Sequence, residues 1–482
     1  MFAIDRSSAV PLTDQIEARL RGLIAGAQLA AGVKLLSIRQ LAAQLGVSPN
    51  TVITAYDRLV AAGLIDSRGT AGFFVCERDN AASDDALLEA GEEQEPVWLA
   101  QQAHDQREGM LLASSGALPT SWLADAIPAA LLQRALARAS GGMASRCPPQ
   151  GLAELRERIA MLMRSQGIAV DASRILTTYG GTHAIDLICR TFVQPGDTVL
   201  VENPGYFLMF GRLRQAGVRI VPIARRPDGV DLDALEAACV EHRPRLLFIQ
   251  SVLHNPTGWG SSAANLHRVL LLAERHGFLV AEDDVQGHFH PGHATRLAQL
   301  SGLSRVIYYS SFCKALSPAL RLGYIAAEPA LLKPLLREKI VSILTTAALN
   351  EFVLLEVLSA GRFRKHLERL QQKLGVARGA AARQLRDAGI ALDHPGEGGL
   401  FLWGSVPGNV DIDLLVKDAY RNSILLSRGA TFMADGRADP HIRFNVVISQ
   451  NVRLGEYLSQ RLAALASART ALAKAAAQSR SP

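Results

Sequence analysis

One lysine of this sequence directly follows a strand that reads as buried. The run RVIYYSS is almost entirely apolar and leads into FCKAL, so Lys314 is expected on a loop just past the strand. A dry position lowers the pKa of a lysine, which frees its amine to form a Schiff base. Seven residues later comes Arg321, which together with the hydroxyl of Ser311 could hold a phosphate through charge-assisted hydrogen bonds.

Further polar groups follow other apolar runs. Asp283 closes FLVAEDD, where a carboxylate would keep a pyridine nitrogen protonated. Asn255, in HNPTG after RLLFIQS, could donate a hydrogen bond to a phenolic oxygen. Gly180 and Gly181 open a helix, where backbone N–H groups and the helix dipole favour a phosphate. Each feature alone is more often an ordinary loop end, but the ordered set indicates one site.

The elements that must position these residues are strands of a parallel sheet. Runs such as TVLVEN, RLLFIQS, FLVAEDD and RVIYYSS alternate with amphipathic helices from about residue 109. Near-continuous apolar strands are typical of sheets buried on both faces. An α/β domain over 109–466 is therefore predicted, with functional loops at the carboxyl ends of its strands.

The first 76 residues predict a separate domain. TDQIEARLRGLIA has helical periodicity with Thr13 as its expected N-cap, and Ser37 can cap a second helix, IRQLAAQL, which Gly46 ends. After the turn GVSPN, a third helix TVITAYDRLVAAG precedes the hairpin LIDSRGTAGFFV. Three helices and a hairpin predict a winged helix-turn-helix over 1–76.

An acidic segment separates the two domains. Residues 77–108 carry two Lys/Arg against ten Asp/Glu and are expected to form a linker, although ALLEA and VWLAQQ could make helical turns. Residues 467–482 form an Ala-rich tail. The net charge of +6 is weak support for an anionic partner.

Composition excludes several classes of protein. No run of about twenty apolar residues predicts a membrane span, and the first residues lack the order of a signal peptide, so a cytoplasmic protein is expected. The five cysteines stand singly, which predicts neither a metal site nor a disulfide framework.

Several motifs together resemble the fold type I aminotransferases: GGTHAIDL, ENPGY, HNPTG, EDD, SSFCKALSPALRLG and HIRFN. With a winged helix in front, the chain resembles the MocR subgroup of GntR-type bacterial regulators. The resemblance covers everything except the linker and about the last fifteen residues. It implies a winged helix-turn-helix followed by a fold type I domain that depends on pyridoxal 5'-phosphate (PLP).

The resemblance also implies roles for matching residues. Lys314 would form the aldimine with PLP, and Asp283 would pair with the pyridine nitrogen. Asn255 would contact the ring oxygen, and Tyr206 would stack on the ring, although an ordinary core aromatic is an equally good interpretation of Tyr206. Arg443, in HIRFN, would clamp the carboxylate of an amino-acid-like ligand. The phosphate would be held by Gly181, Thr182, Ser311 and Arg321.

In the winged helix, the residues expected to contact DNA are Ser37, Arg39, Ser48, Asn50, Thr51 and Arg68. Arg68 falls in the wing, and Thr51 begins the recognition helix. The Arg that commonly follows the turn serine is absent, because Pro49 and Asn50 stand there. We therefore expect an altered operator preference. A winged helix used only for protein contacts is the alternative.

Three departures affect the large domain. Gln286 stands where a Tyr is usual three residues after the aspartate, His183 replaces a common Gln, and Arg146 lies near the position of a Tyr that often reaches the partner subunit's phosphate. An amide can hydrogen-bond but supplies no phenol. PLP binding is therefore expected, while transamination is expected to be weak at most.

Three hypotheses follow. The first is a homodimeric transcription regulator that binds operator DNA and senses PLP, or an amino acid or amine joined to it at Lys314. The second is a PLP-dependent aminotransferase with a vestigial or regulatory DNA-binding head. The third is a regulator that has lost the cofactor.

Overall fold

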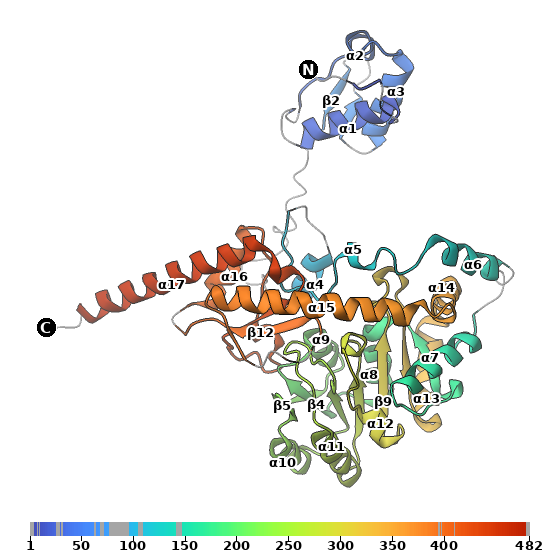
Figure 1. Ribbon diagram of the computed structural model, residues 1–482, viewed down its shortest axis with the longest axis vertical. Coiled ribbons are helices and arrows are strands. Elements are labelled where there is room, and N and C mark those ends of the chain that lie inside the picture. The colour runs from blue at the N-terminus through green and yellow to red at the C-terminus, as the bar shows by residue number, and fades with distance from the viewer. Residues whose placement is uncertain are drawn as a thin grey trace. The chain divides into compact units, whose positions relative to one another are not determined.

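The computed structural model forms two compact units, residues 1–93 and 94–482, and each is described by itself (Figure 1). The residues that the structure describes are 4–6, 8, 10–25, 29, 32–61, 64–67, 72–76, 96–104, 109–140, 147–393, 396, 398–408 and 410–478. No helix among them is long and apolar enough to cross a membrane.

The first unit has the predicted three helices and hairpin. Its elements are α1 (Leu12–Ala25), α2 (Ile38–Leu45), α3 (Pro49–Ala61), β1 (Ile65–Ser67) and β2 (Phe73–Val75). The two strands pair antiparallel, and the helices enclose an apolar core that includes Ile16, Leu41 and Tyr56. The N-cap prediction for Thr13 is wrong, because α1 begins one residue earlier and Thr13 lies inside it.

The second helix has the predicted ends. The Ser37 side chain accepts a hydrogen bond from the backbone N–H of Gln40, whose side chain in turn accepts one from the backbone of Ser37. This reciprocal pair satisfies two N–H groups that a helix start leaves free. Gly46 ends the helix with φ 64°, a left-handed conformation that glycine adopts without strain.

One helix lies within the predicted linker range. α4 (Pro96–His104) buries Trp98 and Leu99. Trp98 packs edge-to-face on Tyr420 at 5.2 Å, and the Tyr420 hydroxyl donates to the Gln102 side chain at 2.9 Å. The large unit therefore includes a helix from the acidic segment. The remainder of the segment, 77–95 and 105–108, lies outside the described residues.

A mixed eight-stranded sheet forms the centre of the large unit (Figure 1). Its order is β3-β10-β9-β8-β7-β4-β5-β6. Strands β9, β8, β7, β4 and β5 run parallel, whereas β10 is antiparallel to both β3 and β9. The strands are β3 (Ile175–Thr178), β4 (Thr198–Asn203), β5 (Arg219–Arg226), β6 (Gly229–Val230), β7 (Leu246–Ile249), β8 (Leu279–Asp283), β9 (Val306–Ser311) and β10 (Gly323–Ala326).

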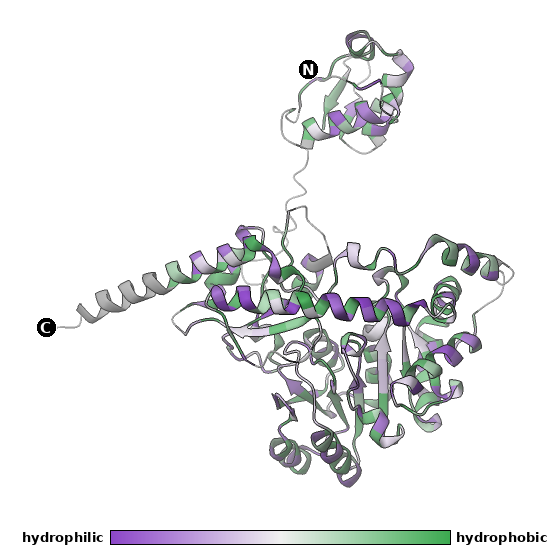
Figure 2. Cartoon of the chain, in the orientation of Figure 1, coloured by the Kyte–Doolittle hydropathy of each residue, from purple (hydrophilic) through white to green (hydrophobic). Residues whose placement is uncertain are grey.

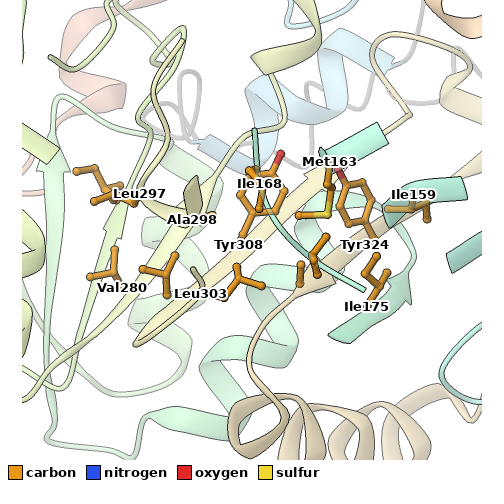
Figure 3. Close-up of a cluster of buried hydrophobic side chains, with 14 of the residues drawn as sticks. Ile159, Met163, Ile168, Ile175, Val280, Leu297, Ala298, Leu303, Tyr308 and Tyr324 are labelled. Carbon is orange, nitrogen blue, oxygen red and sulfur yellow. The ribbon is translucent and has the colours of Figure 1, made fainter. Parts of the chain in front are cut away.

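Apolar cores cover both faces of this sheet. Along β4, Val199 and Val201 belong to one core cluster and Leu200 to another, because successive side chains of a strand point to opposite faces. Figure 3 shows part of the second cluster, in which Tyr308 of β9 and Tyr324 of β10 lie among aliphatic side chains. The prediction of a sheet buried on both faces is confirmed, which explains its near-continuous apolar runs.

Helices surround the sheet and carry hydrophobic and hydrophilic residues within the same helix (Figure 2). They are α6 (Ala129–Ser140), α7 (Ala153–Ser165), α8 (Gly180–Phe192), α9 (Phe207–Gln215), α10 (Leu232–His242), α11 (Ala263–His276), α12 (Leu297–Ser301), α13 (Pro329–Ile343) and α14 (Ala348–Ser359). The short helix α5 (Thr120–Leu123) instead places Leu123 in the core of the second sheet.

A second, antiparallel sheet follows along the chain. Its order is β11-β12-β14-β13, with bounds Ala391–Leu392, Phe401–Ser405, His441–Asn445 and Ser427–Arg428 in that order. It shares a core with the long helix α15 (Arg362–Asp387), with α16 (Ile412–Arg421) and with the start of α17 (Val452–Gln478). α17 continues into the range expected to be a tail.

Candidate functional site

The predicted large-domain residues lie at the ends of neighbouring strands. Asp283 is the last residue of β8, Lys314 follows β9, Asn255 lies on the loop after β7, and Tyr206 immediately precedes α9 after β4. The carboxyl ends of adjacent parallel strands meet at one edge of a sheet. The fold therefore brings these four residues together.

Lys314 presents a buried amine. Its Nζ donates a hydrogen bond of 2.6 Å to the backbone oxygen of Gly116. Burial, assisted by the nearby cation of Arg443, lowers the pKa of Lys314 to about 8. A Cβ at position 116 would lie 3.0 Å from Nζ, so any larger residue there would crowd the amine. Among the described residues, no carboxylate forms an ion pair with Lys314, so its protonated form is poorly compensated.

Asp283 is a buried carboxylate. Burial raises its pKa to about 6, although hydrogen bonds from the Val285 backbone and from the side chains of Tyr309 and Gln250 lower that pKa. The Val285 N–H donates to Oδ1 at 2.9 Å. A cation placed beside Asp283 would stabilise its charged form, as a protonated pyridine nitrogen would.

Gln250 joins Asp283 to Asn255. The Gln250 side chain accepts a 2.8 Å hydrogen bond from the Asn255 backbone N–H, besides its contact with Asp283. Its own backbone N–H donates at 2.6 Å to Glu202, which pairs with the buried Arg225 at 2.5 Å. Sequence reasoning missed this residue, although a polar Gln at the end of the apolar run RLLFIQ was a usable signal.

Arg443 lies on β14 with 5% of its surface exposed. Nη1 donates to Asn255 Oδ1 at 2.8 Å, and Nη2 donates to the Ser114 backbone oxygen at 2.6 Å. The guanidinium lies over the rings of Phe401 and Phe432, at 4.5 and 4.7 Å from their centroids. Burial lowers the pKa of Arg443 to about 9. No acidic side chain of the described residues pairs with it, so an anion would be its natural partner.

Side chains of the site donate hydrogen bonds to backbone carbonyls of the segment 113–117. Besides the bonds from Arg443 to Ser114 and from Lys314 to Gly116, the side-chain nitrogen of Asn445 donates to the oxygens of Ser115 and Ala117, both at 2.8 Å. The segment thus lies across the site. Sequence reasoning missed it, because backbone carbonyls carry no residue-type signal.

The predicted phosphate residues surround the start of α8. Gly180 has φ 75°, and a Cβ there would lie 3.3 Å from Arg321 Nη2. A Cβ on Gly181 would lie 2.8 Å from a methyl group of Val285. Only glycines therefore leave the space in which backbone N–H groups and the exposed Arg321 can receive an anion.

The two predicted hydroxyls differ in their surroundings. Thr182 is exposed and hydrogen-bonds the hydroxyl of Tyr206, whose pKa burial raises to about 12. Ser311 is buried, and its hydroxyl donates to the Leu322 backbone oxygen at 3.2 Å while accepting from the Cys313 N–H. Ser311 would have to turn to donate to a phosphate.

These residues fit PLP. The buried amine of lowered pKa suits its aldehyde. The buried carboxylate, which has no cationic partner among the described residues, suits its pyridine nitrogen. The space bounded by glycines beside an exposed arginine suits its phosphate.

The departures lie close by. Gln286 is buried, and its side-chain oxygen has no hydrogen-bond partner within the described residues. His183 Nδ1 accepts from the Tyr179 N–H at 3.0 Å, and burial lowers its pKa to about 4, so the ring is neutral at pH 7. Arg146 lies outside the described residues.

In the first unit, two predicted DNA contacts also satisfy backbone N–H groups at helix starts. Ser37 caps α2, and the hydroxyl of Ser48 accepts from the Thr51 N–H at 3.2 Å while lying 2.8 Å from the Thr51 hydroxyl. Arg39 and Asn50 are exposed. Arg68 lies outside the described residues.

Comparison with known proteins agrees with both units. Residues 12–75 match the family "Bacterial regulatory proteins, gntR family", and residues 108–454 match "Aminotransferase class I and II". The "Probable rhizopine catabolism regulatory protein MocR" of Rhizobium meliloti is 30% identical over 394 residues, which cover 77% of this chain and 76% of that protein. The chain belongs to the MocR-type GntR regulators, with a class I and II aminotransferase domain.

Other relatives fit this membership. YdcR of Escherichia coli, named an uncharacterized HTH-type transcriptional regulator, is 27% identical over 93% of this regulator and 99% of its own length. A 2-aminoadipate transaminase of Thermus thermophilus is 32% identical over 70% of the regulator and 86% of its own length.

A solved structure also resembles the large unit. The crystal structure of LysN, the α-aminoadipate aminotransferase of Thermus thermophilus complexed with N-(5'-phosphopyridoxyl)-L-leucine, has a TM-score of 0.69 and 26% identity. It covers 80% of the regulator and 100% of its own chain.

Proposed function

We propose that this chain is a PLP-dependent transcription regulator, which binds operator DNA through its first unit and responds to PLP, or to an amino compound joined to it, at Lys314. The observation that carries the proposal is the amine of Lys314, buried beside Asp283 with a lowered pKa, in a chain that begins with a winged helix-turn-helix. DNA binding also supports a cytoplasmic location.

PLP supplies an aldehyde that amines attack and a ring that withdraws electrons. The amine of Lys314 would be the group that bonds to this aldehyde, because its lowered pKa leaves about a tenth of it unprotonated at pH 7. Asp283 would hold the pyridine nitrogen in its protonated form. Asn255 donates its side-chain amide to the ring oxygen, since its carbonyl oxygen already accepts from Arg443.

The phosphate is held by the N–H groups at the start of α8, including that of Gly181, with Thr182, Ser311 and Arg321. Tyr206 would pack on the ring, and its hydrogen bond to Thr182 orients its side chain. These assignments are supported by the convergence of the residues on one edge of the sheet.

Arg443 is proposed to select ligands that carry a carboxylate. Its guanidinium is buried against two aromatic rings and has no acid partner in the described part of the chain. A planar fork suits a carboxylate, and burial strengthens the attraction. An amino acid would therefore be preferred over a simple amine.

Covalent trapping tests the cofactor site. The full-length protein is incubated with PLP, reduced with borohydride, digested and analysed by mass spectrometry. We expect the phosphopyridoxyl group on the peptide that contains Lys314, and none on that peptide in Lys314→Ala. A wild-type protein that retains no PLP would favour the regulator without cofactor.

Gel retardation tests the regulatory role. The protein with and without PLP, and then with amino acids, is mixed with its own upstream DNA. We expect retardation whose strength changes with the ligand. Failure to bind any fragment under either condition would refute DNA-binding regulation.

The alternative is an aminotransferase with a regulatory head, which the similarity to 2-aminoadipate transaminase favours. Gln286 in place of a phenol argues against efficient turnover. Mixing the PLP-loaded protein with panels of amino acids and 2-oxo acids separates the two: steady multiple turnover supports the enzyme, and a spectral change without turnover supports the sensor.

We also propose a homodimer. Val341 and Leu344, at the end of α13, are exposed apolar residues of the kind that subunit interfaces cover. Light scattering at several concentrations would test it, with a monomeric mass as the contrary result.

A further inference from the structure

The outward face of α3 carries an apolar side chain near its start. Val52, Ala55 and Leu59 are completely buried and face the core of the first unit. Ile53 points away from them with 37% of its surface exposed, and it is absent from the apolar residues packed on that core. A side chain exposed on the face that lies away from the core is free to contact a partner of the first unit.

Asn50 lies beside Ile53 on the same face, since residues three apart are neighbours on a helix. The Thr54 hydroxyl donates to the Asn50 backbone oxygen at 3.0 Å, which occupies the donor of that threonine within the helix. The Asn50 side chain is exposed, and among the described residues no hydrogen bond to it is recorded. Its amide is therefore available to a ligand.

This face has little positive charge. The side chain of Arg58 extends toward α1, where it pairs with Asp14 at 2.6 Å and Glu17 at 3.4 Å. Asp57 is exposed one turn after Ile53 and repels phosphate. Between residues 48 and 57 the helix has no lysine or arginine, so its start is suited to base edges rather than to the phosphate backbone.

We propose that Ile53 contacts the 5-methyl group of a thymine in the major groove, next to a base pair that Asn50 reads. In the major groove, thymine presents a methyl group, and asparagine forms a two-bonded pair with adenine. The start of a recognition helix is the part that reaches base edges. The inference rests on the proposed DNA-binding function and adds a base preference to it, namely A·T pairs at the positions that these two residues contact.

The experiment uses uracil, which is thymine without the methyl group. A fragment bound by the full-length protein is first selected from a random DNA pool, and each thymine of the half-site is then replaced singly by deoxyuridine. For wild type, we expect affinity to fall about three- to fivefold at one or two positions, the value of one buried methyl group. Ile53→Ala should bind thymine and uracil equally at those positions.

Val60→Ala is the matched control. Val60 is equally exposed, at 37%, and lies two turns further along the same side of α3. This variant should retain the full uracil effect. Circular dichroism of both variants checks that the helix remains folded.

Three results would overturn the inference. One is a wild type insensitive to every uracil, and another is an Ile53→Ala variant that keeps the wild-type sensitivity. The third is a change in oligomeric state in Ile53→Ala with unchanged DNA affinity, which would assign Ile53 to a protein contact. Absence of any bound fragment would refute the proposed DNA binding as well, so the two failures are distinguishable.

Discussion

Arg443 and Asn255 share a hydrogen bond of 2.8 Å, although Arg443 lies on one sheet and Asn255 on a loop that leaves the other. Arg443 lies on β14 of the antiparallel sheet, and Asn255 follows β7 of the eight-stranded sheet. The proposed carboxylate clamp therefore also orients the amide proposed to contact the cofactor ring. A substitution at Arg443 should therefore change the affinity for both ligands.

Replacing Arg443 by Lys should impair recognition of amino acids. A single ammonium cannot serve Asn255, Ser114 and a carboxylate in the way that a planar fork can. We expect the amino acid concentration that half-saturates the spectral change of the PLP-loaded protein to rise at least about tenfold, the effect of losing one charged hydrogen bond. Amines without a carboxylate should show no such rise. The exposed Arg437→Lys serves as the control, and an unchanged midpoint in Arg443→Lys would contradict the clamp.

Attachment of PLP should accelerate with pH through the pKa of Lys314. The neutral amine is the reactive form, and burial lowers its pKa to about 8 from an ordinary value of 10.5. The rate should therefore rise about tenfold for each pH unit below 8 and level off above it. Stopped-flow absorbance between pH 6.5 and 9.5 measures this. A rate still rising steeply beyond pH 9 would show that the amine is not perturbed.

The Glu202–Arg225 pair should matter far more to stability than a comparable surface pair. Glu202→Gln leaves the guanidinium of Arg225 buried without a charged partner, which costs about 3–5 kcal/mol. Glu236 and Arg275 are also close, at 2.6 Å, but Arg275 is exposed and Glu236 is only half-buried, so Glu236→Gln should cost no more than about 1 kcal/mol. Urea unfolding of the apoprotein compares the two variants, and equal losses would show that the buried pair has no special role.

Substitutions at Ser37 should separate its capping role from its proposed DNA contact. Both Asn and Asp cap helices well, so Ser37→Asn and Ser37→Asp should keep the unfolding free energy within about 0.5 kcal/mol, whereas Ser37→Ala should lose about 1 kcal/mol. Only Asp adds a negative charge that phosphate repels. We expect DNA affinity to fall most for Ser37→Asp. Equal affinity of the Asn and Asp variants would remove Ser37 from the interface.

Much of the fold was predictable because burial leaves a pattern. The strand TVLVEN coincides with β4, and the capped helix IRQLAAQL coincides with α2. Lys314, Asp283 and Asn255 were located by their positions after apolar runs, since parallel strands bring their carboxyl ends together. The start of α1 was misplaced by one residue, because Thr13 resembles a cap but Pro11 already accepts the first helical bonds.

Contacts that depend on tertiary packing were not predictable. Ser114 and Gly116 take part through backbone oxygens and meet partners about two hundred or more residues away in the chain. The choice of Arg225 as partner of Glu202 also depends on how strands align, because charged residues of both signs are spread along the sequence. Only the folded arrangement identifies such pairs.

The segment 113–117 makes ligand binding an exchange of hydrogen bonds. A cofactor that takes the amine of Lys314, and a carboxylate that takes Arg443, compete with the oxygens of Gly116 and Ser114 for the same donors. Each oxygen so released must find water or another donor, because a buried carbonyl without one is costly. Ligand affinity is therefore a difference between two sets of bonds, and occupancy would remove two of the hydrogen bonds that hold the segment 113–117. By thermodynamic linkage, any contact that requires these hydrogen bonds lowers the affinity for the ligand by the same factor by which the ligand weakens that contact.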